Sequence, residues 1–335
     1  MSAIPKTQLV SLFETTGSLD VLKTAKIASP QIAAANDIII KNKYAGVNFI
    51  DSYLRKGLYP SPELPFTLGQ ESSGVVVAIG DEVTNFKVGD NVAYIAPKAF
   101  AQYTKLTDKS KLVKLDDNLS EDEFKIYGGA LLQGLTALTF ISESYNVKKD
   151  DFILVWAASG GTGSILVQLA SQRGAKVIAI ASTSEKLAKT KELGAQFTIN
   201  YKTEDVAARV KEITNGQGVA AVYDSVGKVS FDISLESLTR KGTFVSFGNA
   251  SGMVPPLVIT RLSAKNIVFV RPRVLGYVET PQEWDHYTGI LLNALQSGDL
   301  KLDISAVYPL SEFSKATEAL ESGKTSGKLI IEIPQ

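Results

Sequence analysis

The stretch Val155–Ala170 reads VWAASGGTGSILVQLA and has glycine at positions 160, 161 and 163. An apolar run, FILVWAA, precedes these glycines, and a helical pattern, SILVQLASQRG, follows them. A strand, a glycine-rich bend and a helix in this order are typical of a dinucleotide-binding turn, here with Ala158 in place of the usual first glycine. The second glycine lets a pyrophosphate approach the backbone, and the third lets the helix lie close to the strand. We therefore predict a bound dinucleotide, with a ligand-free tight turn as the alternative.

Strand-like and helical runs alternate from residue 151 onward. Apolar runs predict six buried parallel strands, at 152–158, 176–181, 196–201, 220–226, 243–249 and 266–272. Helical patterns lie between the strands, at 164–174, 184–194, 204–216 and 229–242. Right-handed crossovers would arrange such strands as a doubly wound, six-stranded parallel sheet of the Rossmann type, in the order 3-2-1-4-5-6.

The segment from residue 1 to about 118 has a different pattern. Short β-rich runs are separated by clusters of Gly, Asn and Asp, which favours a compact barrel or sandwich. Ser120 and Glu123 then fit a capping box that opens a helical region. A helix and a strand predicted within 307–333 do not continue the alternation, so we expect them to return to the first domain. The predicted α/β organisation is a β-rich domain over 1–131, a dinucleotide-binding domain over 132–274 and a return segment over 275–335.

The charge balance argues against several classes of partner. The chain has 335 residues, with 35 Lys and Arg against 35 Asp and Glu. A net charge of zero gives no electrostatic reason to bind nucleic acid or a membrane surface. No apolar run approaches the length that spans a bilayer, so we expect no membrane partner. The N-terminal sequence has no targeting pattern. We expect a cytoplasmic protein, with the nucleus left open as a second compartment.

The content of cysteine and histidine excludes further chemistry. The chain has no Cys and one His, His286. Disulfides, thiol nucleophiles and thiolate metal sites are therefore excluded, and we expect no metal site. A serine hydrolase would have to use His286, yet no G-x-S-x-G motif is present. His286 lies in an amphipathic helical pattern that has Pro in its first turn, so we expect a surface or locally hydrogen-bonded histidine.

Several longer motifs point to one family. They are YAGVNFIDSYLRKGLYP (44–60), LPFTLGQESSGVVVAIGDEV (64–83), FKVGDNVAY (86–94), AASGGTG (157–163) and KELGA (191–195). On these motifs the chain resembles the medium-chain dehydrogenase/reductase superfamily, and within it the zinc-free quinone oxidoreductases related to ζ-crystallin, fungal members in particular. The resemblance covers essentially the whole chain. It implies a GroES-like first domain that the C-terminal segment rejoins, and an active site in the cleft between the two domains.

The chain departs from the zinc-dependent branch of this superfamily. Asn48 stands where alcohol dehydrogenases have a catalytic Cys, and Gln70 replaces the His of their G-H-E motif. Without a Lewis acid, the substrate must need little activation, as a quinone does. The resemblance implies that Asn48 and Tyr53 line the substrate side of the nicotinamide. Tyr53 could hydrogen-bond a quinone oxygen or stack on the ring. We therefore predict a zinc-independent quinone reductase with Asn48 and Tyr53 as its catalytic residues.

The residue after the second predicted strand, 176–181, indicates which cofactor is used. An NAD site has an acidic residue where that strand ends, but position 182 is Ser, which leaves room for a 2′-phosphate. Lys186 and Tyr201 match positions that bind this phosphate in similar quinone reductases. We therefore predict NADPH as the cofactor. The full set of predicted cofactor-binding residues is Asn48, Thr136, Gly160, Gly161, Thr162, Gly163, Ser182, Lys186, Tyr201, Phe247 and Lys328.

Three further expectations concern substrates and partners. An NADPH-dependent reductase of alkenals or enones is the alternative enzyme. A function of another class is binding of AU-rich RNA, which the resemblance suggests and for which residues 104–114, with four lysines, are the candidate segment. The resemblance also suggests a homodimer, formed through the last sheet strand near NIVFVRPRVL, whose open edge could pair with a second copy.

Overall fold

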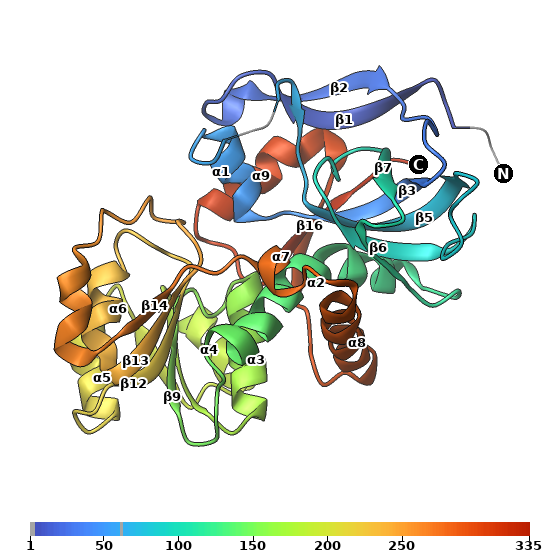
Figure 1. Ribbon diagram of the computed structural model, residues 1–335. Helices are drawn as coiled ribbons and strands as arrows, with labels where there is room; N and C mark the ends of the chain where they lie inside the picture. Colours follow the sequence, from blue (N-terminus) through green and yellow to red (C-terminus); the bar gives the residue numbers. More distant parts are fainter. Residues whose placement is uncertain (1–3, 61–62) are drawn as a thin grey trace. The chain divides into compact units, whose positions relative to one another are not determined.

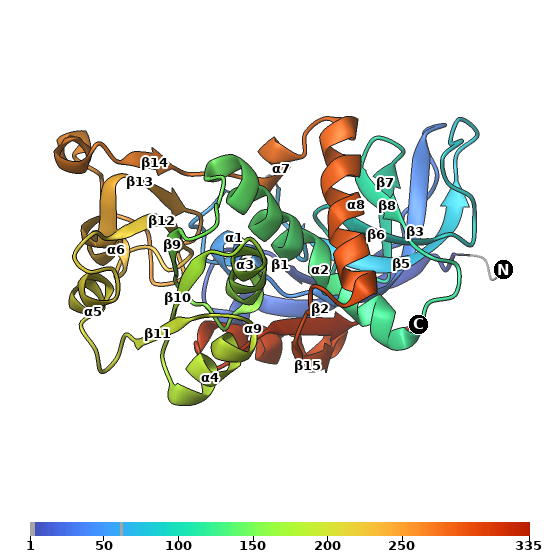
Figure 2. The same ribbon diagram turned by 90° about the horizontal axis from the view of Figure 1, so that it is seen from below.

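The computed structural model describes residues 4–60 and 63–335 (Figures 1 and 2). The chain forms two compact units. Unit 1 comprises Met1–Leu132 and Asp303–Gln335, and unit 2 comprises Gln133–Leu302. The predicted α/β fold class is confirmed, because unit 1 is β-rich and unit 2 contains the six-stranded sheet.

Unit 2 is built on a six-stranded sheet in the order β11-β10-β9-β12-β13-β14, which is the predicted 3-2-1-4-5-6 order. All its neighbouring strands are parallel. The strands are β9 (Phe152–Val155), β10 (Lys176–Ala181), β11 (Phe197–Asn200), β12 (Val219–Asp224), β13 (Leu238–Ser246) and β14 (Val268–Val270). Leu154, Ile178 and Val222 are fully buried, as expected for strands that are covered on both faces.

Four helices connect these strands. They are α3 (Gly161–Gln172), α4 (Ser184–Glu192), α5 (Val206–Ile213) and α6 (Phe231–Ser237). Figure 1 shows α3 and α4 against one face of the sheet and α5 and α6 against the other. The predicted helix over 229–242 was too long, because α6 ends at Ser237 and β13 begins at Leu238. Leu238 is already paired with Val219 of β12, so sheet pairing takes over where the helix was expected to continue.

The return segment was predicted to start at residue 275, whereas the division into compact units places Asp303 as the first residue that rejoins unit 1. The remaining elements of unit 2 are a π-helical turn (Phe140–Ser144), a 3-10 helix (Ile259–Lys265), α7 (Val274–Tyr277) and α8 (Pro281–Ser297). Helix α8 packs within unit 2, because the Leu291 side chain lies over Gly134 and the Tyr287 hydroxyl donates to Glu143. Amphipathic periodicity predicted this helix but not the surface it covers. His286 is exposed on α8, as predicted.

Unit 1 contains two sheets. The larger has seven strands, in the order β15-β16-β3-β5-β6-β8 with β7 paired to β3, and the smaller has the order β2-β1-β4. The strands are β1 (Thr7–Phe13), β2 (Leu22–Ala28), β3 (Asp37–Gly46), β4 (Phe66–Thr67), β5 (Glu71–Ile79), β6 (Asn91–Ile95), β7 (Tyr103–Thr107), β8 (Lys111–Lys114), β15 (Ile304–Pro309) and β16 (Lys328–Glu332). The helices are α1 (Phe49–Arg55), α9 (Phe313–Glu321) and two 3-10 turns, Leu19–Val21 and Leu310–Glu312.

The C-terminal part of the chain completes the larger sheet of unit 1. Strand β16 lies between β15 and β3, parallel to β15 and antiparallel to β3. Ile331 of β16 is paired with Ala45 and is fully buried. Residues 307–333, where we predicted a helix and a strand that return to the first domain, lie in unit 1.

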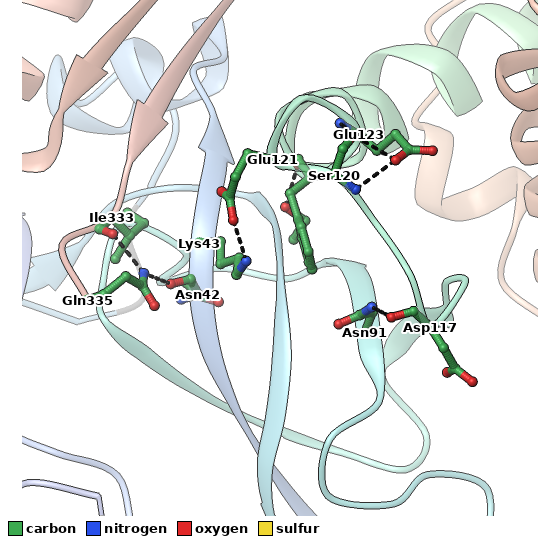
Figure 3. Close-up of polar contacts among 11 residues, drawn as sticks. Asn42, Lys43, Asn91, Asp117, Ser120, Glu121, Glu123, Ile333 and Gln335 are labelled. Atoms are coloured by element: carbon green, nitrogen blue, oxygen red, sulfur yellow. Dashed lines mark hydrogen bonds and ion pairs between the residues drawn. The ribbon is translucent and has the colours of Figure 1, made fainter. Parts of the chain in front are cut away.

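Helix α2 (Glu121–Thr139) begins with the predicted capping box (Figure 3). The Glu123 carboxylate accepts hydrogen bonds from the backbone N–H and the hydroxyl of Ser120, both at 2.7 Å. Together with the π-helical turn, the helix runs from Glu121 to Ser144 and is long and apolar enough to cross a membrane, contrary to our expectation. Its apolar window is 72% buried inside the protein, as in the core helix of a globular protein.

Candidate functional site

The glycine-rich turn has the geometry of a pyrophosphate cradle. Gly160 is the N-cap of α3, has extended backbone and provides no side chain that caps the helix, so the first-turn N–H groups lack the usual side-chain acceptor. A Cβ at Gly163 would lie 2.2 Å from the carbonyl oxygen of Ala157, so the close packing of α3 on the turn requires glycine there. A Cβ at Gly160 would meet only that oxygen, at 3.2 Å. The fold needs Gly160 much less than it needs Gly163, which suits a turn that leaves room for a ligand.

Three of the predicted cofactor residues come together where β10 and β11 end. The strands are parallel, with Ala181 of β10 paired to Asn200 of β11, and the Tyr201 N–H donates to the Ala181 carbonyl at 3.3 Å. Ser182 follows β10 directly. Lys186 lies in the first turn of α4, where its N–H donates to the hydroxyl of the N-cap Thr183. Burial, and then the positive charge of Lys202, lower the pKa of the Lys186 ammonium.

The other predicted cofactor-binding residues of unit 2 do not lie at the ends of β10 and β11. Gly161, Thr162 and Gly163 form the first turn of α3. Phe247 directly follows β13, where its N–H donates to Asp224 at 2.8 Å, and its ring centroid lies 5.4 Å from that of Phe140. Thr136 is half-buried on α2. Gly160, Ser182, Tyr201 and Phe247 thus follow the carboxyl ends of four parallel strands, the edge where open α/β sheets bind ligands.

In unit 1, a buried polar cluster surrounds Asn48. Lys328 Nζ lies 2.7 Å from Glu71 Oε1, and both side chains are fully buried. Asn48 joins the two, because its Oδ1 accepts from Lys328 at 2.9 Å and its Nδ2 donates to Glu71 at 2.8 Å. Burial lowers the pKa of the Lys328 ammonium, and the charge of Glu71 opposes this shift. Both the Asn48 and the Lys328 side chains form hydrogen bonds inside unit 1. Their predicted contacts with a ligand stay predictions.

Asp51 holds the same loop from the other side. Its two carboxylate oxygens accept the N–H groups of Asn48, at 3.2 Å, and Gly69, at 3.0 Å. Desolvation raises the pKa of the Asp51 carboxyl to about 7, although these two hydrogen bonds lower it. Asp51 therefore fixes the backbone at both Asn48 and the Gly69–Glu71 segment.

Tyr53 belongs to a small aromatic group on and beside α1. Its ring lies 5.2 Å from Tyr59 in an edge-on arrangement and 6.1 Å from Phe49, measured between centroids. Tyr53 is buried. Its neighbour Arg55 anchors the helix, because the guanidinium donates to the Gly17 carbonyl and pairs with Glu321 of α9.

Glu71 and Asp51 were missed as site residues in the sequence. The Asn48–Asp51 spacing is that of a capping box, which is a local signal that could have been found. The partnership of Glu71 with Lys328 carries no local signal, because the residues are 257 positions apart. Across residues 4–60 and 63–335, no group of three or more His, Cys, Asp or Glu residues is placed to hold a metal ion.

Comparison with known proteins gives matches over both units. Residues 34–151 match the alcohol dehydrogenase GroES-like domain, and residues 161–292 match the zinc-binding dehydrogenase family. A probable quinone oxidoreductase of Schizosaccharomyces pombe is 43% identical over 320 residues, which is 94% of each chain. The Escherichia coli quinone oxidoreductase complexed with NADPH superimposes with a TM-score of 0.91 at 36% identity, over 97% of this chain and 99% of the other. The Pseudomonas syringae quinone oxidoreductase superimposes at 0.92 with 40% identity, with the same coverage.

The GroES-like unit and the doubly wound sheet with its glycine turn together define a medium-chain dehydrogenase/reductase. Within that superfamily, the chain belongs to the quinone oxidoreductase family. The matched name "zinc-binding dehydrogenase" describes the wider family, because this chain has no cysteine and a single histidine.

Proposed function

We propose that this protein is an NADPH-dependent quinone oxidoreductase that works without a metal ion. The observation that carries the proposal is the end of β10, where a neutral Ser182 lies beside Lys186 and Tyr201 instead of the carboxylate of an NAD site. The NADPH-bound E. coli structure, which superimposes on nearly the whole chain, supports the same cofactor.

The chain's own residues would hold the cofactor at three places. The first-turn N–H groups of α3, at Gly161–Gly163, bind the pyrophosphate, and Gly160 lets it approach. Ser182, Lys186 and Tyr201 bind the 2′-phosphate. Thr136, Phe247, Asn48 and Lys328 contact the nicotinamide half. When bound, NADPH supplies the reducing electrons, and the protein supplies position and exclusion of water.

The substrate side depends on Tyr53 and Asn48. Tyr53 donates a hydrogen bond to a quinone oxygen, while solvent delivers protons to the product. Lys328 and Glu71 together fix which way the Asn48 amide faces, since its oxygen accepts and its nitrogen donates within that cluster. A quinone needs no Lewis acid, because it is electron-poor and its reduction gives an aromatic product.

A panel of substrates tests the activity. We expect 9,10-phenanthrenequinone and benzoquinones to be reduced by NADPH far faster than an enone is reduced or an alcohol oxidised. Tyr53→Phe should lower quinone turnover more than NADPH affinity, and Tyr103→Phe, in β7 of the same unit, serves as the matched control. Faster turnover of the enone would favour the alkenal and enone reductase instead, and alcohol oxidation as the main activity would overturn the proposal.

The second partner that we propose is another copy of this chain. Strand β14 is an edge of the six-stranded sheet, and an open edge can pair with another strand. Large apolar side chains are exposed on and before it, at Met253, Val258, Ile259 and Val268. Sedimentation velocity should show a dimer, and Val268→Asp should shift it toward the monomer. A monomeric wild type at micromolar concentration would contradict this.

The RNA alternative receives no comparable support. Of the four lysines at 104–114, Lys105 pairs with Asp37 at 3.4 Å and Lys114 with Asp90 at 2.9 Å. Their charges are thus partly neutralised within the protein. The absence of a mobility shift with AU-rich RNA at low salt would end this alternative, and a salt-dependent shift that NADPH displaces would revive it.

A further inference from the structure

Two lysines, Lys186 and Lys202, follow the ends of the paired strands β10 and β11, and only Lys186 is among the cofactor residues named above. The last backbone bond between these two strands runs from the Tyr201 N–H to Ala181. Lys202 is the next residue on the β11 side. On the β10 side, Lys186 lies in the first turn of α4. Adjacent parallel strands therefore deliver both lysines to the same edge of the sheet.

The backbone at Lys202 is held in a defined turn. The Lys202 N–H donates to Oδ1 of Asn200 at 3.1 Å, and the N–H groups of Thr203 and Glu204 donate to the Asn200 carbonyl at 3.0 and 2.9 Å. The Asn200 N–H in turn donates to Glu204 Oε1 at 2.7 Å. Lys202 is thus an exposed side chain on a fixed support.

Two carboxylates of this region, those of Glu204 and Glu185, have other partners. Besides accepting from Asn200, Glu204 pairs with Arg209 at 3.2 Å. Glu185 is held at the start of α4 by backbone and Thr183 hydrogen bonds, which lower its pKa. Among residues 4–60 and 63–335, no salt bridge joins Lys202 to a carboxylate. Instead, its charge acts on Lys186, whose pKa is lowered first by burial and then by Lys202. Two like charges held together in this way favour an anionic ligand.

We propose that Lys202 and Lys186 form a two-cation site for the 2′-phosphate of NADPH, and that Lys202 is a residue that sets the preference for the phosphorylated cofactor. The inference rests on the proposed function and deepens it. A phosphate monoester carries a charge of about −1.5 to −2 and three acceptor oxygens, which suits two ammonium groups better than one. The uncharged neighbours Ser182 and Tyr201 add no opposing charge.

The test compares Lys202→Met with a matched control, Lys191→Met. Lys191 lies in the last turn of α4, at the opposite end of the helix from Lys186. The probes are NADPH, NADH, 2′-AMP and 5′-AMP, titrated by calorimetry and by emission of Trp156, whose ring lies 6.1 Å from that of Tyr201. We expect Lys202→Met to lower the affinity for NADPH and for 2′-AMP about 5- to 10-fold. A loss of this size lies between the contribution of an exposed ion pair and that of a charge-assisted hydrogen bond. NADH and 5′-AMP should bind as before, and Lys191→Met should change nothing.

A second measurement separates a ligand contact from a structural role. Removing Lys202 relieves repulsion, so the ligand-free variant should unfold at the same or a higher temperature than wild type, while the NADPH-induced rise in Tm should be smaller. Equal losses for NADH and NADPH, or wild-type NADPH affinity in Lys202→Met, would overturn the inference but leave the proposed function intact. A wild-type protein that binds NADH as tightly as NADPH would instead refute the proposed cofactor.

Discussion

Lys328 Nζ lies 2.7 Å from Oε1 of Glu71, and neither side chain is exposed to solvent. Glu71 also accepts the Leu132 N–H at 2.8 Å, so this carboxylate joins β16, α1 and α2 within unit 1. Removing one partner of a buried ion pair lowers the free energy of unfolding strongly, because the remaining charge is left in a medium that solvates it poorly.

Lys328→Met should therefore lower the free energy of unfolding by about 3–5 kcal/mol, as measured by urea denaturation. The double variant Lys328→Met/Glu71→Gln should be more stable than Lys328→Met alone, because neither charge of the pair remains. Lys23→Met is the control, since its pair with Glu14 is exposed and should contribute less than about 1 kcal/mol. A double variant no more stable than the single one would contradict this account of the pair.

Asp51 should make stability depend on pH. Its pKa is about 7 in the folded protein and near 3.8 when unperturbed, so between these values the folded state binds the extra proton. The free energy of unfolding then falls as pH rises through this window, by at most about 1.4 kcal/mol for each pH unit. The advantage of wild type over Asp51→Asn should shrink between pH 5 and 7, as measured by urea denaturation. Parallel profiles for the two proteins would show that Asp51 is already ionised at pH 5.

The two outer glycines of the turn should respond differently to alanine. Gly160→Ala is expected to lose much less stability than Gly163→Ala, because its Cβ meets only one atom, at 3.2 Å. Gly163→Ala should unfold at a clearly lower temperature, because its Cβ would overlap the Ala157 carbonyl. Gly160→Ala should still weaken NADPH and NADH about equally, since both carry the pyrophosphate. If Gly160→Ala binds NADPH and NADH as tightly as wild type does, the prediction that the pyrophosphate binds at this turn is wrong.

Lys186→Ala should discriminate between the cofactors. Loss of one charge-assisted hydrogen bond costs about 1.5–3 kcal/mol, so NADPH should bind about 10- to 150-fold more weakly while NADH is spared. Fluorescence titration of both cofactors measures this. An equal loss for both would show that Lys186 does not contact the 2′-phosphate.

Quinone reduction should not need a metal ion. Dialysis against a strong chelator is expected to leave the rate unchanged, because the chain has no cysteine and Gln70 stands where zinc-dependent relatives have histidine. Metal analysis of the same sample provides the check. Stoichiometric zinc that leaves together with activity would be decisive against the prediction.

The parts of this fold that were predicted are those with local signals. The strands of unit 2 could be predicted because parallel strands buried on both faces are continuous apolar runs, as at Ile178 and Val222. The boundary between α6 and β13 could not, because Thr239–Gly242 has no apolar periodicity and β12 alone decides where pairing begins. The residue at which the chain rejoins unit 1, Asp303, lacks a local signal for a similar reason. The pattern of α8 shows an apolar face but not that Gly134 lies beneath it.

The residues of the candidate site also fall into those with a local sequence signal and those without one. The glycine turn and Ser182 could be predicted because short spacings determine their geometry. The cluster around Glu71 could not, because an ion pair between polar residues far apart in sequence leaves no periodic trace. Lys202 was missed because its relation to Lys186 depends on the pairing of two strands.

The position of β16 between β15 and β3 has a consequence for biosynthesis. A ribosome makes β3 and β5 first, then all of unit 2, and only afterwards the strand that fills the sheet of unit 1. Domains generally fold as units during synthesis, so unit 2 is free to fold while unit 1 still lacks an interior strand and Glu71 still lacks its counter-ion. For that interval the nascent chain leaves one edge of β3 unpaired at Tyr44–Gly46, where β16 will add, and a chaperone that recognises extended apolar segments would find its target there.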